Sequence, residues 1–322
     1  MIHEKTTVTA EQAGRADGVV RTLVKKSRSE VRGLFSLGCV SLNGTVCTDI
    51  NAMVKSGDKV DVRFDPHQRH HERRRAWEDD NFEIVFEDEH LIVVDKTAGV
   101  LTVPANPGDK NTLIHAVELY FKHRGVRERP QLVHRLDRDV SGLLIFGKTR
   151  EVAEKLQNQF EARKPERLYY ALVKGVVEEE GTFESYLATA TSHQRYSTKI
   201  KEKAELAITH FKREQVLDRA SWVRVWLETG RRNQIRVQFA DAGHPVLGDP
   251  RYRADLSDHP RWKSKRLALH AAMLGFDHPE TRKPLKFQSK MPAVMRIFIE
   301  QSKGNAVQPK TNAQARSQMK RK

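Results

Sequence analysis

The residues best suited to chemistry gather at positions 134–142, HRLDRDVSG, directly before the apolar run 143–146. Burying unpaired charge is costly, so this density of charged side chains at the mouth of a hydrophobic strand favours a functional site. A carboxylate held there can act as a nucleophile or accept a proton. Asp137 and Asp139 stand two residues apart and, working as a pair, would predict a glycoside or nucleoside hydrolase. The structural alternative is a salt-bridged, solvated turn that leads into a core strand.

The charge of the chain favours a nucleic acid partner. Lys and Arg number 57 and Asp and Glu 42 among 322 residues, so the formal net charge is +15 with histidine neutral. An excess of this size attracts polyanions over a long range, and nucleic acid is the first candidate. No apolar stretch approaches the roughly 20 residues that span a bilayer, so we expect no membrane partner.

The cysteines and the N-terminal composition favour an intracellular protein. Residues 1–16 are polar and lack the apolar core of a secretory signal. Cys39 and Cys47 form no CxxC pair and stand near no histidine at a metal-ligand spacing. We therefore expect a cytoplasmic protein with reduced thiols and no metal site.

Residues 15–65 have the pattern of a small domain with two short helices and a twisted sheet. The apolar residues between 19 and 24 have helical spacing, and SRSE at 27–30 has the form of a capping box that begins a second helix. Asn43-Gly44 predicts a tight hairpin turn, and the alternation at 60–64 predicts a further strand.

This pattern resembles the small RNA-binding domain named after ribosomal small-subunit protein S-four. GCVSLNG at 38–44 and VKSGDKVDV at 54–62 match its two strand motifs. The resemblance implies an RNA-facing surface that includes four basic residues, Lys25, Lys26, Arg28 and Arg32. Four such residues within eight positions favour phosphate contact over ordinary solvated helix charges.

Composition divides the rest of the chain. We expect residues 1–14 to be disordered, 66–81 to be a linker without hydrophobic periodicity, and 302–322 to be a disordered basic tail. Strand patterns outnumber helical ones in residues 82–301, which we expect to form the catalytic domain. The expected fold class is α+β: a small N-terminal α/β RNA-binding domain plus a domain built mainly on an antiparallel sheet.

Three ordered motifs resemble those of the RluA-type pseudouridine synthases. HRLD at 134–137, followed by SGLL at 141–144, matches the central motif of this family. DKTAGV at 95–100 resembles its DKPAG loop, and TGRRNQIRV at 229–237 resembles TGRTHQIRV. Together with the first domain, the resemblance covers about residues 15–300.

The resemblance implies a reaction that needs one carboxylate and no cofactor. Isomerising uridine to pseudouridine breaks the glycosidic C–N bond, turns the uracil and joins ribose C1′ to uracil C5, without redox change. Asp137 matches the catalytic aspartate of the family, as nucleophile or proton acceptor, and Arg236 matches the arginine that pairs with it. An opposite charge nearby keeps a carboxylate ionised.

Tyr169 matches a tyrosine of the family that begins a strand motif, here YYALVKG at 169–175. The resemblance implies that its ring stacks on the uracil and that its hydroxyl assists removal of the C5 proton. Tyr170 is the competitor, because side chains alternate along a strand and only one of the two can face the site. Packing in the core is the structural alternative for either tyrosine.

Further matched residues have expected roles around the same site. Arg135 would enter the RNA where the target uridine flips out, because the glycosidic bond is otherwise inaccessible. Ile235 and Leu269 are expected to pack the pocket floor, and His134 to make a structural hydrogen bond. The expected partner is RNA, ribosomal rather than transfer RNA, bound by a monomer.

Three residues depart from the family pattern outside the catalytic positions: Thr97, Asn233 and Gln238. They bear on the choice of substrate rather than on the activity. The alternative from a different functional class is a non-catalytic RNA-binding or ribosome-assembly factor. The positive net charge and the first domain are equally consistent with that function.

Overall fold

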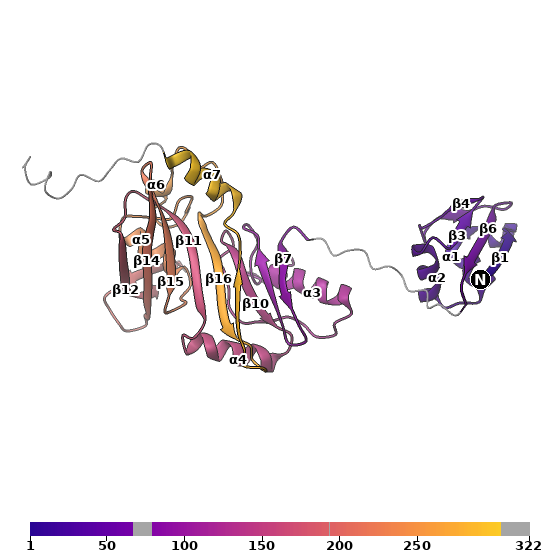
Figure 1. The fold of residues 1–322 in the computed structure, drawn as a ribbon, viewed down its shortest axis with the longest axis horizontal. Helices are drawn as coiled ribbons and strands as arrows, with labels where there is room; N and C mark the ends of the chain where they lie inside the picture. The colour runs from indigo at the N-terminus through magenta and orange to yellow at the C-terminus, as the bar shows by residue number, and fades with distance from the viewer. Residues whose placement is uncertain (67–78, 193, 304–322) are drawn as a thin grey trace, which may run out of the picture. The chain divides into compact units, whose positions relative to one another are not determined.

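The computed structural model describes residues 1–66, 79–192 and 194–303 (Figure 1). Contacts divide the chain into two compact units, Met1–Trp77 and Glu78–Lys322. Each unit has its own hydrophobic core. The predicted linker at 66–81 and tail at 302–322 lie largely outside the described residues.

The first unit packs two helices, α1 (Ala16–Val24) and α2 (Arg28–Ser36), against a four-stranded antiparallel sheet of order β1-β6-β3-β4. Ser27 and Glu30 cap α2 reciprocally, as the capping-box pattern predicts. The strands of this unit are β1 (Ile2–Thr7), β2 (Gly14–Arg15), β3 (Val40–Leu42), β4 (Thr45–Val46), β5 (Met53–Val54) and β6 (Lys59–Phe64).

The expectation that residues 1–14 are disordered is wrong. Strand β1 pairs with β6 along its whole length, from Ile2 opposite Phe64 to Thr7 opposite Lys59, and a 3-10 helix follows at Ala10–Gln12. The side chains of β1 are mostly polar and exposed because it is an edge strand, so it carries no hydrophobic alternation. Backbone pairing with a buried neighbour orders it instead.

The second unit is built on a sheet of order β13-β12-β14-β15-β11-β16-β10-β8-β7, to which β17 and β9 add short pairings. In the described residues every ladder of this sheet is antiparallel except the one between β10 and β16. The predicted α+β class is confirmed. Its strands are β7 (Phe82–Glu87), β8 (Leu91–Lys96), β9 (Gln131–Leu132), β10 (Ser141–Gly147), β11 (Glu166–Lys174), β12 (Glu180–Thr189), β13 (Arg195–Thr198), β14 (Glu205–Leu217), β15 (Ala220–Leu227), β16 (Leu269–Asp277) and β17 (Pro284–Gln288).

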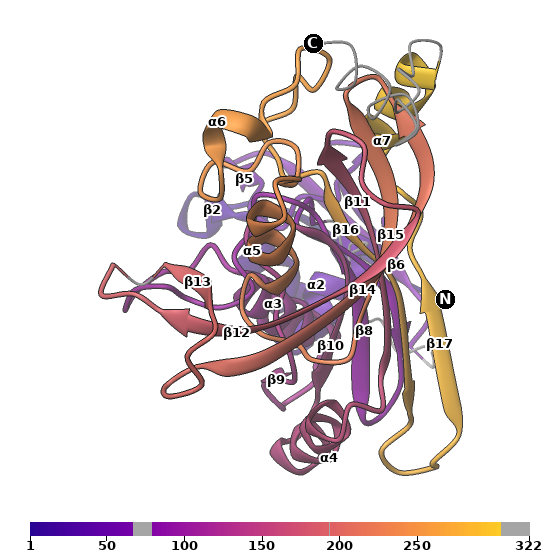
Figure 2. The ribbon, with the colours of Figure 1, turned by 90° about the vertical axis from the view of Figure 1, so that its left-hand side faces the viewer.

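Helices cover this sheet at separate places (Figure 2). Thr149 caps α4, whose apolar face packs on β10, while α5 packs against β12, β13 and β14. The helices of the second unit are α3 (Leu113–Arg124), α4 (Arg150–Glu161), α5 (Gln234–Asp241), α6 (Ala254–Ser257) and α7 (Ala293–Ser302).

Strand β10 directly follows the loop that carries Asp137, and all seven of its residues are buried. It therefore gives that loop a rigid end. Gly142 has φ +118°, and a Cβ at this position would lie 2.2 Å from the carbonyl oxygen of Ala271 on β16. A side chain would therefore meet backbone, which explains the glycine in the Ser141-Gly142 pair. The parallel β10–β16 pairing fixes the start of the strand and the loop before it.

Within the described ranges, none of the helices has the length and apolar character needed to cross a membrane. In the same ranges, no three side chains from His, Cys, Asp and Glu come together as a set of metal ligands.

Candidate active site

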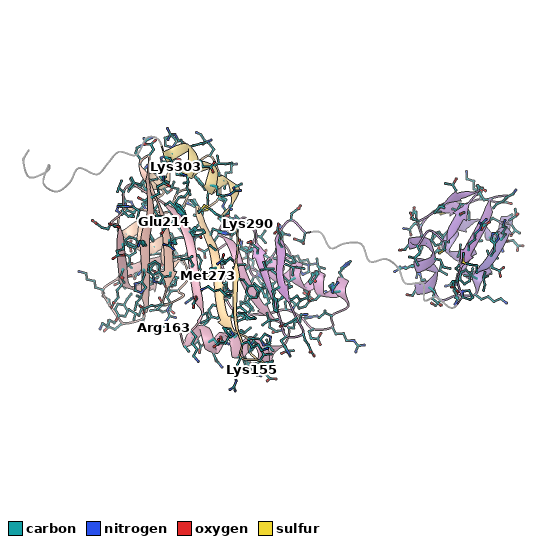
Figure 3. All side chains as sticks on the ribbon, in the orientation of Figure 1. Lys155, Arg163, Glu214, Met273, Lys290 and Lys303 are labelled. Carbon is teal, nitrogen blue, oxygen red and sulfur yellow. The ribbon has the colours of Figure 1, made fainter. Side chains whose placement is uncertain are left out.

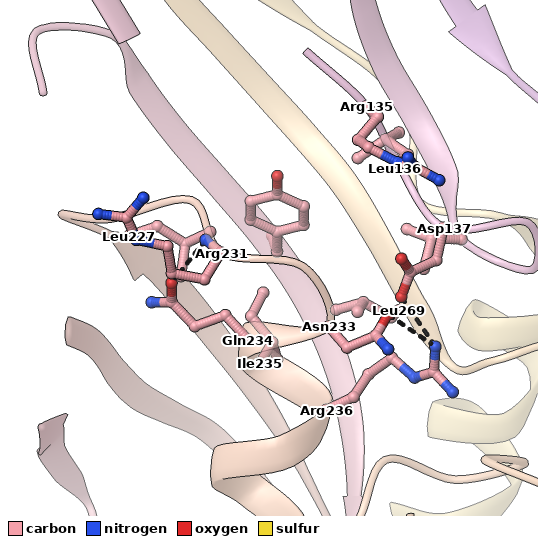
Figure 4. A pocket seen from close by; sticks show the side chains of 12 residues that line it. Arg135, Leu136, Asp137, Leu227, Arg231, Asn233, Gln234, Ile235, Arg236 and Leu269 are labelled. Carbon is pink, nitrogen blue, oxygen red and sulfur yellow. Dashed lines mark hydrogen bonds and ion pairs between the residues drawn. The ribbon is translucent and has the colours of Figure 1, made fainter. Parts of the chain in front are cut away.

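The loop before β10 brings Asp137 to a small cavity of about 60 Å³ (Figure 4). Six residues predicted to have roles at the site line it together: Arg135, Asp137, Tyr169, Ile235, Arg236 and Leu269. They come from the 133–140 loop, β11, α5 and β16, which are far apart in the chain. The sheet and α5 thus bring the predicted catalytic and pocket residues to one place.

Two buried side chains hold the loop that carries Asp137. The hydroxyl of Thr102 donates to the carbonyl of Leu136 at 2.8 Å and accepts from its N–H at 3.2 Å. The amine of Lys96 donates to the carbonyls of Arg138, Thr97 and Val100 at 2.7–2.9 Å. Burial lowers the pKa of Lys96 to about 7. Three carbonyl acceptors nevertheless require three N–H donors, and only the protonated amine has three.

Arg236 joins two carboxylates in the cavity wall. Its Nη1 donates to Asp137 Oδ2 at 2.8 Å, while its Nε and Nη2 donate to the two carboxylate oxygens of Asp249 at 2.7 and 2.9 Å. The side chain of Asp137 is 21% exposed and that of Asp249 is fully buried. Burial alone would lower the pKa of Arg236, but its hydrogen bonds to Asp249 and the two nearby carboxylates outweigh burial and raise it. Arg236 therefore stays charged and oriented.

Asp249 is a second partner of Arg236 to which the motif reasoning assigned no role. It accepts backbone N–H bonds from Arg251 and Tyr252, so it sits in a tight turn that also positions Arg236. The available signal was the number of donors on Arg236: a guanidinium has five, and one carboxylate cannot satisfy them when the group is buried.

The structure separates the two tyrosines. Tyr169 is 8% exposed and lines the cavity, whereas Tyr170 points to the other face of the sheet and packs edge-on against Trp222. Burial raises the pKa of the Tyr169 hydroxyl; Arg167 opposes this effect and the charge of Asp137 reinforces it. At neutral pH Tyr169 is therefore a protonated phenol.

The neighbours of Asp137 have structural contacts. His134 accepts a hydrogen bond from the N–H of Ile145 at 3.3 Å and stacks on Phe160 with 4.6 Å between ring centroids. Burial, reinforced by the charge of Arg167, lowers the pKa of His134 to about 3, which keeps it neutral at pH 7. Asp139 pairs with Arg138 and does not line the cavity. A carboxylate pair for hydrolysis is therefore not assembled there.

The three residues that depart from the family pattern all have partners. Thr97 donates its hydroxyl to the carbonyl of Asn81, and Gln238 donates to the carbonyl of Ala207. Asn233 precedes α5 with φ +59° and contacts both Arg236 and the hydroxyl of Tyr252. Asn233 lines the cavity, so it is the departure best placed to affect the substrate.

The predicted RNA-binding residues of the first unit lie around the junction of α1 and α2. Lys25 ends α1 in a left-handed conformation, and Arg28 begins α2. Lys26 pairs with Glu30 at 3.1 Å, while Arg32 is exposed. Three of the four side chains thus face solvent, and the fourth is half-buried in an ion pair.

Comparisons with known proteins agree with this architecture. The family model described as RNA pseudouridylate synthase matches residues 90–241, and the S4 domain model matches residues 16–60. The chain is 36% identical to ribosomal large subunit pseudouridine synthase D of Zymomonas mobilis, over 92% of this chain and 96% of that protein. It is 32% identical to the protein of the same name from Pseudomonas aeruginosa, over 91% of this chain and 93% of that one.

Solved structures share the fold. Human RNA pseudouridylate synthase domain containing 4 superposes with a TM-score of 0.56 at 19% identity, covering 67% of this chain and 91% of that one. Human RNA pseudouridylate synthase domain containing 1 gives 0.55 at 22% identity, covering 75% and 96%.

Fold, domains and relatives together define an RNA-modifying isomerase with an S4 domain ahead of its catalytic unit. The chain belongs to the RluA-type family of RNA pseudouridine synthases, as its three motifs predicted.

Proposed function

We propose that this enzyme isomerises uridine to pseudouridine in ribosomal RNA, with Asp137 as its one catalytic carboxylate and without a cofactor. The observation that carries the proposal is the Asp137–Arg236 ion pair at the wall of a cavity on the sheet. The choice of ribosomal RNA rests on the relatives named for the large ribosomal subunit, which match this chain over more than nine-tenths of their length.

In the proposed mechanism Asp137 acts at the junction of ribose and uracil, as nucleophile or as proton acceptor. Arg236 holds the carboxylate ionised and oriented, and Asp249 holds Arg236. The N1–C1′ bond breaks, the uracil turns, and C5 bonds to C1′. The C5 proton then leaves and N1 gains a proton, so the reaction is balanced without any added group.

Tyr169 and Arg135 act on the base and on the strand. The ring of Tyr169 stacks on the uracil, and its protonated hydroxyl assists removal of the C5 proton: the oxygen accepts that proton while its own proton passes through solvent to N1. Arg135 is exposed at the cavity and enters the RNA in place of the flipped uridine. Ile235 and Leu269 pack against the bound base.

The Asp137→Asn substitution tests the proposal. We expect it to abolish pseudouridine formation in ribosomal RNA, because the amide cannot attack or accept a proton, while RNA affinity stays within about twofold. The product is measured by nuclease digestion and chromatography, and the affinity by filter binding. Unchanged pseudouridine formation would overturn the assignment of Asp137, and release of free uracil would indicate hydrolysis.

The RNA class is tested separately. Pseudouridines are mapped in total cellular RNA with and without the protein. We expect the protein-dependent positions to lie in ribosomal RNA; positions confined to transfer RNA would contradict the proposed substrate. A cellular role that survives Asp137→Asn would favour the alternative of a non-catalytic assembly factor.

A further inference from the structure

A second, larger cavity of about 550 Å³ adjoins the one that holds Asp137. The two cavities share four lining residues, Arg135, Tyr169, Leu227 and Arg231, so they lie next to each other. The larger one extends toward the end of α4 and the start of β11. If the base of one nucleotide lies on Tyr169, the RNA backbone next to that nucleotide would therefore enter the larger cavity.

Four arginines line this second cavity, and Arg167 differs from the others. Arg163, which follows α4 (Figure 3), lies 3.7 Å from Glu228, and Arg231 pairs with Glu205 at 3.0 Å. Arg167 is only 9% exposed, and its Nε has no hydrogen-bond partner within the described residues. Its one hydrogen bond there is a long one, 3.5 Å from Nη2 to the carbonyl of Leu227.

The surroundings hold the guanidinium of Arg167 in place without neutralising it. It lies over the ring of Phe160 at 5.4 Å from the centroid. A Cβ at Gly230 would come within 2.4 Å of its Nη1, so the glycine allows this close approach. Burial lowers the pKa of Arg167, an effect that Tyr169 opposes, and among the described residues no carboxylate forms an ion pair with it. A buried, preoriented cation of this kind suits an anionic ligand.

We propose that Arg167 and the cavity it lines bind one backbone phosphate of the RNA strand next to the target uridine. This inference rests on the proposed function, because it takes RNA as the substrate of the adjoining cavity. A phosphodiester oxygen in the cavity would accept from the part of the Arg167 guanidinium that lines it, and Arg163, which lines the same cavity, would add a second positive charge. Arg167 would thus set the register of the strand over Asp137.

The structural alternative is that Arg167 only packs the loop after β15 against Phe160. The two roles differ in the salt dependence of RNA binding. Removing one ionic interaction with a phosphate lowers the slope of log affinity against log salt concentration by about 0.7 for a single strand and 0.9 for a duplex. A change in packing alone leaves this slope as it is in the wild type.

The experiment compares the full chain with Arg167→Gln, Gly230→Ala and Arg224→Gln, using large-subunit ribosomal RNA transcribed in vitro. Gly230→Ala displaces the guanidinium of Arg167 but keeps its charge. It is therefore a second test of the phosphate site if Arg167→Gln fails to fold. Arg224 is the matched control because it opposes Tyr170 in the β11–β15 ladder, so it lies on the other face of the sheet, where it pairs with Glu214. Affinity is measured at several salt concentrations, together with the single-turnover rate of pseudouridine formation.

We expect Arg167→Gln and Gly230→Ala to weaken binding about tenfold and to lower the salt slope by about 0.7–0.9. Arg224→Gln should leave the affinity within about twofold. A wild-type slope in both cavity variants, whatever happens to the rate, would overturn the phosphate site. If the wild-type protein forms no pseudouridine in this RNA but the slope still falls in the variants, the substrate assignment fails and the anion site stands.

Discussion

At the scale of single residues, Arg236 pairs with two carboxylates at once, those of Asp137 and Asp249. Removing it leaves Asp249 buried with only its two backbone donors. We predict that Arg236→Gln abolishes activity and lowers the free energy of unfolding by about 3–5 kcal/mol, the cost of an unpaired buried charge. Urea unfolding measures the change.

Two further variants test whether the loss of stability comes from the broken ion pair or from the substitution of any arginine. Combining Arg236→Gln with Asp249→Asn removes the unpaired charge, so the double variant should regain part of the missing stability. Arg138→Gln breaks the more exposed pair with Asp139 and should cost less than about 1 kcal/mol. An Arg236→Gln protein as stable as Arg138→Gln would contradict the prediction.

The two adjacent tyrosines provide a matched test of the hydroxyl. Tyr169→Phe keeps the ring in the cavity but removes the proton relay, so we predict a fall of about 10²-fold or more in the single-turnover rate with RNA affinity nearly unchanged. Tyr170→Phe, on the opposite face of the sheet, should stay within about twofold of wild type. Equal rates for the two variants would leave Tyr169 with a packing role only.

At the scale of elements, the junction of β10, β16 and the residue after β17 depends on the neutral form of His270. Arg266 donates to the hydroxyl of Ser141, which is 2.8 Å from His270 Nδ1, and Ser289 lies 3.1 Å from His270 Nε2 and donates onward to Asp95. Neutral histidine with its proton on Nε2 satisfies this chain. Burial, followed by the charge of Arg266, lowers the pKa of His270 to about 4.

This lowered pKa predicts a pH dependence of stability. The unfolded chain binds a proton at His270 below about pH 6.5, whereas the folded chain does so only near pH 4, so the contribution is complete above 6.5 and is lost as the pH falls to 4. We expect wild type to lose about 3 kcal/mol more than His270→Gln over this range, measured by urea midpoints.

Elements with strong local signals could be predicted from the sequence, and those defined by distant pairing could not. The capping box of α2 and the Asn43-Gly44 turn depend on neighbouring residues and are found where expected. Strand β1 was missed because its order comes from β6, more than fifty residues away. In the site, motif matching assigned a role to Arg236 but none to Asp249. The five donors of a guanidinium call for a second acceptor only when the group is buried, and that burial is seen in the fold.

At the scale of the whole molecule, the first unit is expected to supply affinity rather than chemistry. We predict that replacing its four basic residues by glutamine lowers the salt slope of RNA binding by about 3, but leaves the rate on saturating RNA within about twofold. These residues are Lys25, Lys26, Arg28 and Arg32. Filter binding across a salt series and single-turnover kinetics measure the two quantities.

A control variant within the same unit tests whether position matters. Lys5 and Arg63 both pair with Asp61 on the sheet, so replacing them removes positive charge away from the α1–α2 junction. The slope should then change by less than about 1. An equal decrease per charge in both variants would mean that the unit attracts RNA only through its overall charge.

The parallel pairing of β10 with β16 has a consequence for synthesis. Ser141 and His270 meet across this ladder although 129 residues separate them. At translation rates of about 5–20 residues per second, the edge of β10 that pairs with β16 stays without its partner for roughly 6–26 s. During that time the loop that carries Asp137 leads into a strand that is open to mispairing. Enzymatic competence is therefore acquired late, and a chain arrested before β16 is a candidate for chaperone binding rather than a partly active enzyme.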